Sequence, residues 1–262
     1  MNKDAMFRKK KWTSLAMLGG VVVIYLIAAF VTGFKMWDGL CAFPQAIKWM
    51  ATSLVPDAEA MERLPKIINK ALETALVSVA VTSVSAIVAF VFSLFGAKTM
   101  KINGVVNQVI RIIAAFFRNV PDVVWAMLLM FSFGQNILTG FFALFFTTFG
   151  LLTRAFIETI EEVSASCVEA LDATGASFGQ IVFQGILPSS ITGIITWILY
   201  MIETNIRNST LIGMLTATGI GYLFDMYYKR LEFGSASVVV LAIVVLVLVI
   251  EMISNIVRKV VR

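Results

Sequence analysis

Long apolar segments alternate with short polar and charged segments along almost the whole chain. A helix of about 20 apolar residues crosses the roughly 30 Å of hydrocarbon in a bilayer. The pattern therefore predicts an all-α integral membrane protein with six transmembrane helices. We expect these helices at residues 15–34, 71–95, 105–133, 137–153, 190–214 and 235–257.

The amino-acid composition favours the same class. Hydrophobic residues make up 59% of the 262-residue chain and charged residues 14%, whereas soluble domains are about 45–50% apolar. The formal net charge of +5 could indicate nucleic-acid binding. The basic residues flank the apolar segments and do not form a stripe, so we expect no nucleic-acid partner.

Basic residues also predict the orientation, because Lys and Arg concentrate in cytoplasmic loops. They occur at the N-terminus, at Lys98 and Lys101, and within residues 258–262. Placing both termini in the cytoplasm brings these clusters to one side and makes residues 1–70 an N-terminal transmembrane helix with an outer connector. A cleaved signal peptide is the rival interpretation, but its apolar run is normally only about 7–15 residues and no small-x-small cleavage site follows.

Two other spans carry features that predict how they pack. In the second span, small residues recur at helical spacing, which lets helix backbones approach in lipid: Ser78, Thr82, Ser85 and Ala89. In the third, Pro121 is expected to deflect the helix because it lacks a backbone donor. Arg118 either extends its head group to the cytoplasmic interface or lines a cavity, and both interpretations remain open.

The segment 164–188 interrupts the apolar pattern with signals for two short helices. Ser166 with Glu169, and Ser177 with Gln180, have the spacing of capping boxes. Gly175 is expected to end the first helix in a left-handed conformation. Gly185 followed by Pro188 is expected to end the second helix just before the next apolar run.

The first of these helices has a small apolar side formed by Val168 and Leu171. This area is too small to form a core of its own. We therefore expect the compact element to dock into something else.

The fifth span contains the sequence least compatible with lipid, residues 203–210. A charge at a helix centre costs about 2.5–3.5 kcal/mol on insertion scales, so these side chains should face protein or water. Glu203 and Arg207 can pair four residues apart. They form either a structural pair or part of a solute path whose candidate residues are Arg118, Glu203, Asn205, Arg207, Asn208 and Thr210.

The loop pattern Glu169-Ala170, Gly175 and Leu187-Pro188 resembles the cytoplasmic coupling loop of permeases from binding-protein-dependent ABC importers. The sequences VEALDATGAS and GILP most resemble those of the phosphonate-transport permeases of that group. The resemblance covers residues 69 to 262, and residues 203–221 match at several positions. It implies a type I ABC importer permease architecture, with a core domain at 71–262 and a coupling loop at 158–188.

The resemblance also implies roles for individual residues. Contact with an ATPase subunit would involve Ser166, Val168, Glu169, Ala170, Leu171, Gly175, Ser177, Leu187 and Pro188. The implied partners are two ABC ATPase subunits, a second permease copy or paralogue, and an extracellular solute-binding protein. The implied location is the plasma membrane of a prokaryote.

The implied function is translocation of phosphonate or a related phosphorus oxyanion. The chain contains no histidine and no GxxxxGK[ST] motif, so we expect no catalytic residues, no metal site, no cofactor and no ATP hydrolysis by this chain itself. A permease for another small solute is the alternative. A multi-pass membrane enzyme and the membrane subunit of a vitamin transporter are further interpretations.

Overall fold

The computed structural model describes residues 3–100, 103–163 and 165–261. These ranges fold into helices joined by short turns, as the apolar pattern predicted. The chain separates into two units, Met1–Leu54 and Val55–Arg262.

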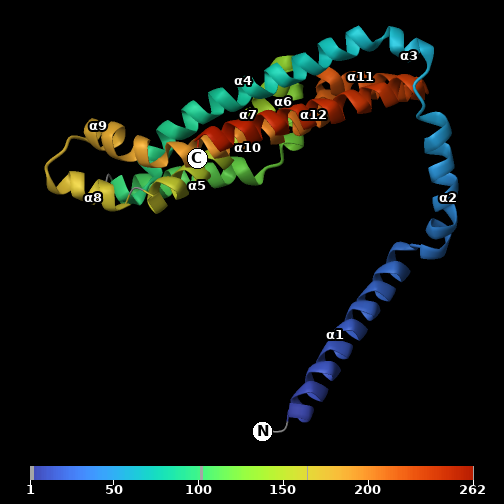
Figure 1. Ribbon diagram of the computed structural model, residues 1–262, viewed down its shortest axis with the longest axis horizontal. Coiled ribbons are helices and arrows are strands. Elements are labelled where there is room, and N and C mark those ends of the chain that lie inside the picture. The colour runs from blue at the N-terminus through green and yellow to red at the C-terminus, as the bar shows by residue number, and fades with distance from the viewer. Residues whose placement is uncertain (1–2, 101–102, 164, 262) are drawn as a thin grey trace. The chain divides into compact units, whose positions relative to one another are not determined.

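The first unit contains α1 (Lys3–Thr32) and α2 (Met36–Ser53) (Figure 1). Residues Lys10–Thr32 of α1 are apolar and long enough to cross a membrane, and their most apolar stretch is entirely unburied. The first expected span is therefore present, a few residues earlier than predicted. Gly33 follows α1 in a left-handed conformation, with φ of +66°.

The second unit is a helical bundle whose elements follow one another with short connections (Figure 1). In chain order they are α3 (Ala58–Glu62), α4 (Leu64–Gly96), the 3-10 turn η1 (Lys98–Met100), α5 (Gly104–Asn119), α6 (Asp122–Phe133), α7 (Ile137–Val163), α8 (Ala165–Ala173), α9 (Phe178–Gln180), the π-helix η2 (Ile181–Ile186), α10 (Leu187–Thr216), α11 (Gly219–Lys229) and α12 (Phe233–Val261).

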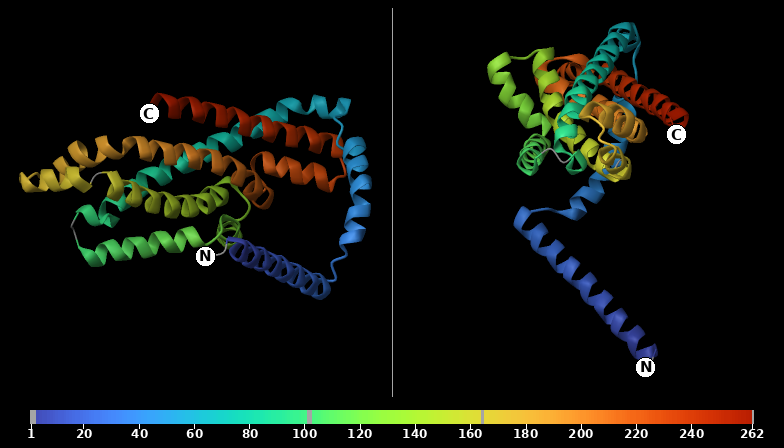
Figure 2. Two further views of the ribbon diagram at one scale, coloured as in Figure 1. Left: turned by 60° about the horizontal axis from the view of Figure 1, so that its bottom comes forward. Right: turned by 90° about the vertical axis from the view of Figure 1, so that its left-hand side faces the viewer.

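Three long helices, α4, α7 and α10, pack on one another at the centre of this unit. Helices α5 and α6 cover α7, and α11 and α12 pack against α4 and α10, as the views in Figure 2 also show. The predicted small-residue face of α4 lies at this centre, because Ser78, Thr82, Ser85 and Ala89 are all fully buried. Its role in helix packing is therefore confirmed.

The third expected span is broken in two. Helices α5 and α6 meet at 87°. Val120 and Pro121 between them have extended backbone, as expected because proline disfavours a helical conformation in the residue before it. The deflection at Pro121 is confirmed, and it is sharp enough to divide the expected helix into α5 and α6. The described chain has five helices long enough to span, or six when this pair is counted as one.

Residues 222–233 lie between the fifth and sixth predicted spans, and the structure forms most of helix α11 there. Its residues Ile220, Leu223 and Tyr227 are buried in a cluster with Ile67 of α4 and Val239 of α12. The three-to-four-residue spacing of these apolar side chains is a helix signal. Charged residues nearby, such as Asp225, Lys229 and Arg230, made this helix signal harder to recognise in the sequence.

Arg63, between α3 and α4, joins the start of α4 to the start of α12. Its guanidinium pairs with the carboxylate of Glu232 and donates to Ser235 Oγ at 3.0 Å. It also lies 5.1 Å from the ring centre of Tyr227. The hydrogen bond with Glu232 raises the pKa of Arg63 above its ordinary value, so the guanidinium stays charged.

Candidate functional site

We call residues 165–186, comprising α8, α9 and η2, the knob. Its first helix, α8, ends as the sequence predicted: Gly175 has φ of +75°, and the N–H of Ala176 donates to Leu171 O at 3.1 Å. This is the six-to-one hydrogen bond of a Schellman motif. A residue with a Cβ would be strained at this position, because the left-handed region favours glycine.

One of the two predicted capping boxes is present. Gln180 Oε1 accepts from the backbone N–H of Ser177 at 2.8 Å and from its hydroxyl at 3.0 Å. Ser166, in contrast, is the second residue of α8 and does not precede it. Its predicted N-cap role is therefore wrong, because the helix begins one residue before Ser166.

The second short helix does not end at Gly185 and Pro188, contrary to the prediction. The helical path continues through η2 into α10, so that one helical segment runs from Phe178 to Thr216. The N–H of Leu187 donates to Val182 O, five residues earlier. Pro188 follows at the point where the hydrogen-bonding pattern changes, so its missing donor does not break the helix.

Gly185 has a packing role that its position in the sequence did not reveal. A Cβ at this residue would lie 2.8 Å from Leu171 Cδ1 and 3.5 Å from Cys167 Sγ. The glycine thus lets η2 approach α8 closely.

An apolar cluster holds the knob onto its own chain. Val168 is only 3% exposed and packs with Ile181, Val182 and Ile186, together with residues of α4 and α7. Leu171 is half-buried against the same cluster. The expected docking of the first helix is therefore onto the bundle itself, and the implied contact of Val168 with an ATPase subunit is wrong because the bundle covers this side chain.

The remaining predicted coupling residues lie mostly at the surface. Leu187 is half-buried, and the exposed residues are Ser166, Glu169, Ala170, Gly175, Ser177 and Pro188. The exposed surface of the knob thus combines these mostly polar and small residues with two large apolar side chains, Phe178 at 45% exposed and Phe183 at 70% exposed. The apolar side is used to fasten the knob to the bundle.

Asn205 of α10 is the centre of a buried polar cluster. Its side-chain amide donates to Thr82 Oγ1 on α4 at 2.9 Å and to Thr148 Oγ1 on α7 at 3.0 Å. One turn further on, Ser78 Oγ and Ser209 Oγ lie 2.7 Å apart. Through these contacts Asn205 joins three central helices. It is 1% exposed, so it is not at a surface in this structure.

The predicted pair of Glu203 and Arg207 is present, with Arg207 Nη2 2.5 Å from Glu203 Oε1. The sequence did not reveal that Arg258 of α12 also approaches Glu203, at 3.9 Å. Glu203 is mostly buried, with a side chain 17% exposed, whereas the Arg207 side chain is 53% exposed. Arg207 is thus the more accessible side chain of the pair.

The other predicted path residues are less closely associated. Asn208 is half-buried and Thr210 is buried, with its hydroxyl 3.3 Å from Ile206 O within α10. Arg118 is exposed in the last turn of α5. Among the described contacts, none joins Arg118 to the polar residues of α10.

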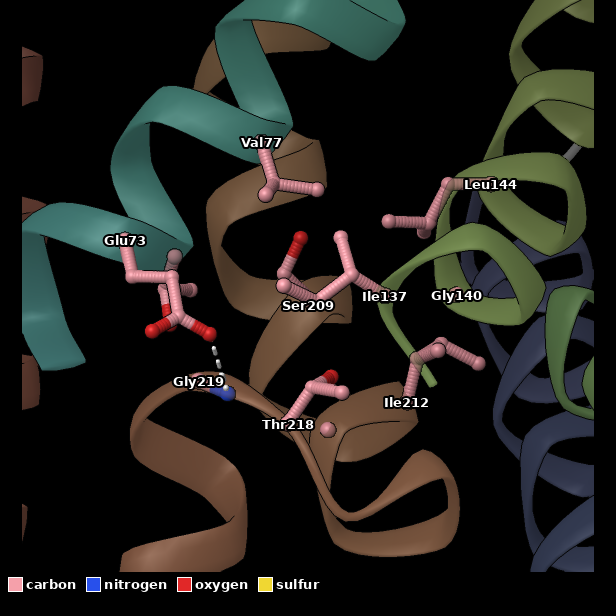
Figure 3. Close-up of a pocket in the computed structure, with 11 residues that line it drawn as sticks. Glu73, Val77, Ile137, Gly140, Leu144, Ser209, Ile212, Thr218 and Gly219 are labelled. Atoms are coloured by element: carbon pink, nitrogen blue, oxygen red, sulfur yellow. Dashed lines mark hydrogen bonds between the residues drawn. The ribbon is translucent and has the colours of Figure 1, made fainter. Parts of the chain in front are cut away.

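A site at the other end of α10 was missed by the sequence interpretation. There the N-terminus of α11 meets α4. The N–H of Gly219 donates to Glu73 Oε1 at 3.2 Å (Figure 3), and that of Ile220 donates to Thr74 Oγ1 at 2.9 Å. We call these two contacts the α11 cap. They border a cavity of about 20 Å³ that Ser209 and Thr218 also line, which is room for about one water molecule.

Comparison with known proteins gives the family and the fold of this chain. Residues 89–262 match the family described as "Binding-protein-dependent transport system inner membrane component". The chain is 27% identical over 190 residues to the phosphate-import permease protein PhnE of Mycolicibacterium smegmatis, with 72% of this chain and 36% of that protein covered. It is 25% identical over 252 residues to the phosphite transport system permease protein PtxC of Stutzerimonas stutzeri, with 95% and 90% covered.

The alignment therefore spans about a third of the first relative and nearly all of the second. A chain in an inward-facing structure of the MetNI methionine ABC transporter has a similar fold, with a TM-score of 0.68. It is 19% identical, and the match covers 79% of this chain and 99% of that chain. At this level of identity the likeness concerns the fold.

Proposed function

Because this chain belongs to the family of binding-protein-dependent transport system inner membrane components, we propose that it is the membrane permease subunit of an ATP-driven importer for a phosphorus oxyanion. The chain is a multi-pass protein of the prokaryotic plasma membrane with the type I ABC importer permease fold. Two such permeases, as copies or paralogues, would enclose the path. Two ATPase subunits and an extracellular binding protein would complete the assembly, with both termini and the knob in the cytoplasm.

The helical continuity from the knob into α10 carries this proposal. The same segment, Phe178–Thr216, contains the end of the knob and the polar residues 203–210. The apolar cluster around Val168 fastens α8 to this segment. A displacement of the knob by an ATPase subunit would therefore move the polar part of α10 directly, because packed apolar contacts transmit strain.

The relatives support the solute class, since one is named for phosphate import and another for phosphite transport. Arg207 is the candidate contact, because a guanidinium can donate two parallel hydrogen bonds to an oxyanion. Glu203 is also approached by Arg258. Its carboxylate would thus keep a cationic neighbour when Arg207 turns toward a passing anion.

The coupling role is tested with Gly175→Val in the assembled transporter. Valine at φ of +75° costs at least about 1–2 kcal/mol, which should distort the end of α8. Gly179→Val is the matched control, because a Cβ at either glycine meets nothing within 4 Å and only Gly175 has positive φ. We expect Gly175→Val to co-purify with the ATPase subunits but to lose uptake per ATP hydrolysed.

Normal coupling in Gly175→Val, with binding-protein-stimulated ATP hydrolysis and uptake equal to those of Gly179→Val, would overturn the coupling role. The two variants are compared in vesicles of the same lipid. Co-purification separates failed assembly from failed coupling.

The solute contact is tested with Arg207→Gln. We expect slower uptake of phosphite or a phosphonate, measured in proteoliposomes with the binding protein present. Arg154→Gln is the control, because Arg154 also pairs with a glutamate four residues away, Glu158, at 2.5 Å and is half-exposed on α7. Equal uptake by the two variants would remove Arg207 from the path.

A further inference from the structure

Helix α2 carries two opposite rows of side chains. The first row is apolar and recurs at alternating spacings of four and three residues, which keeps it on one helix face. Its members are 38–63% exposed: Met36, Leu40, Phe43, Ile47, Met50 and Leu54. None of the residues Met36–Ser53 is buried, so the first unit itself leaves this apolar row exposed.

The second row is polar and lies on the opposite side of the same helix. It has the same spacing and consists of Asp38, Cys41, Gln45, Lys48 and Thr52. At 100° per residue the two rows face directly away from each other. Trp49 lies near the polar row, and Trp37 lies at the boundary between the two faces, where an indole ring is favourable at a membrane surface.

The position of α2 in the chain supplies an independent argument about its surroundings. It begins only four residues after Thr32, where the apolar helix α1 ends. The apolar segment of α1 is unburied and long enough to cross a bilayer, so it brings the start of α2 to the membrane surface. The two helices run in different directions after the turn at Gly33 (Figure 1).

We propose that α2 lies flat in the membrane interface, with its apolar row in the lipid and its polar row facing water. An amphipathic helix of this kind buries its apolar face about 5–10 Å into the boundary between head groups and acyl chains. The polar row contains one anionic and one cationic residue, Asp38 and Lys48, so burial of apolar area and not surface charge holds the helix.

The contact of α2 with lipid is independent of the identity of the solute and of the coupling mechanism. Without it, α2 would be part of a solvated connector. The connector would then be fastened to the membrane between α1 and α3, and only its polar row would be accessible to a water-soluble protein.

Cysteine labelling in the full-length protein tests the proposal, because Cys41 is an exposed native thiol in the polar row. In a Cys167→Ala background, a bimane label is placed at Cys41, or at single cysteines made by Ile47→Cys, Met50→Cys or Thr52→Cys after Cys41→Ser. The labelled proteins are reconstituted in phosphatidylcholine vesicles. Quenching is measured with brominated acyl chains and, separately, with iodide in the water.

We expect labels at positions 47 and 50 to show blue-shifted emission and to lose fluorescence in brominated lipid. Labels at positions 41 and 52 should instead lose fluorescence with iodide. Equal iodide quenching at all four positions would overturn the proposal in favour of a solvated helix. Protection of positions 47 and 50 from both quenchers would overturn it in favour of a protein-covered helix.

Discussion

The two ends of α10 are held in different ways. At the knob, apolar side chains such as Val168, Ile181 and Ile186 interlock with α4 and α7. At the other end, backbone lies against backbone: a Cβ on Gly221 would lie 1.9 Å from Thr210 O, and one on Gly213 would lie 2.5 Å from Thr218 O. There the α11 cap adds two hydrogen bonds, donated by backbone N–H groups of α11 to side chains of α4.

This difference predicts how each end responds to change. Side chains in an apolar cluster can shift rotamers to absorb a small change in volume. Two backbones in direct contact have no such freedom, so the end near α11 requires glycine. Two exchangeable hydrogen bonds, however, are easier to break than a packed cluster. We therefore expect the knob to act as a stiff joint and the α11 end to open more readily.

The largest effect is expected from Gly221→Ala. The added methyl group would overlap the backbone of Thr210 and Met214, so α11 must move away from α10. We expect a loss of stability of about 3 kcal/mol or more, measured as a lower melting temperature in detergent and a lower yield of the assembled complex.

The matched control at the other end of α10 is Gly185→Ala. Its added methyl group would meet the far end of the Leu171 side chain at 2.8 Å, which can rotate away. We expect a loss of less than about 1.5 kcal/mol. If both alanine variants melted at the same temperature, the contrast between the two ends would be wrong.

A smaller effect is expected from Asn205→Leu, midway between the two ends. The substitution removes the hydrogen bonds to Thr82 and Thr148 and leaves their buried hydroxyls without this partner. We expect a loss of about 1–2 kcal/mol, because hydrogen bonds between membrane helices contribute about that much or less.

Asn208→Leu is the control for this variant, since Asn208 is half-buried on the same helix and outside the buried cluster. Thermal unfolding of the two purified variants provides the comparison. A larger loss from Asn208→Leu would mean that the Asn205 cluster does not hold the central helices together.

The smallest of these effects is expected from Thr74→Val, which preserves shape but removes the acceptor for the Ile220 N–H. Loss of a side-chain acceptor at a helix N-terminus costs about 1 kcal/mol. Hydrogen exchange should therefore speed up in α11 and remain unchanged in the knob. Ser83→Ala is the control, because the Ser83 hydroxyl is exposed and donates to Val79 O within α4.

If hydrogen exchange in Thr74→Val sped up equally throughout the bundle, the α11 end would not open independently of the rest. The difference between the α11 end and the knob would then depend only on the close backbone contacts at Gly213 and Gly221.

The features that were predicted correctly depend on neighbours in sequence. Gly175 ends α8 because its conformation is set by its own backbone. Gln180 caps Ser177 across three residues, and Glu203 pairs with Arg207 across four. The small-residue face of α4 follows from helical periodicity. Each of these patterns is visible in a short window of the chain.

The features that were missed depend on contacts between distant residues. Thr148 and Asn205 are 57 positions apart, and Thr74 and Ile220 are 146 apart. Gly185 and Pro188 have the appearance of a helix end in sequence, yet the helical path runs through them from η2 into α10, and α8 packs closely against Gly185. A local pattern cannot specify which distant helix will supply such a partner.

The sequence by itself determined the membrane class, the positions of most helices and the left-handed turn in the knob, because apolar periodicity and backbone preference act over a few residues. The tertiary structure alone decided that Val168 faces its own bundle, that Asn205 joins three helices and that Glu73 and Thr74 cap α11. These outcomes depend on which helix faces meet, and burial then selects the polar groups that must find a partner.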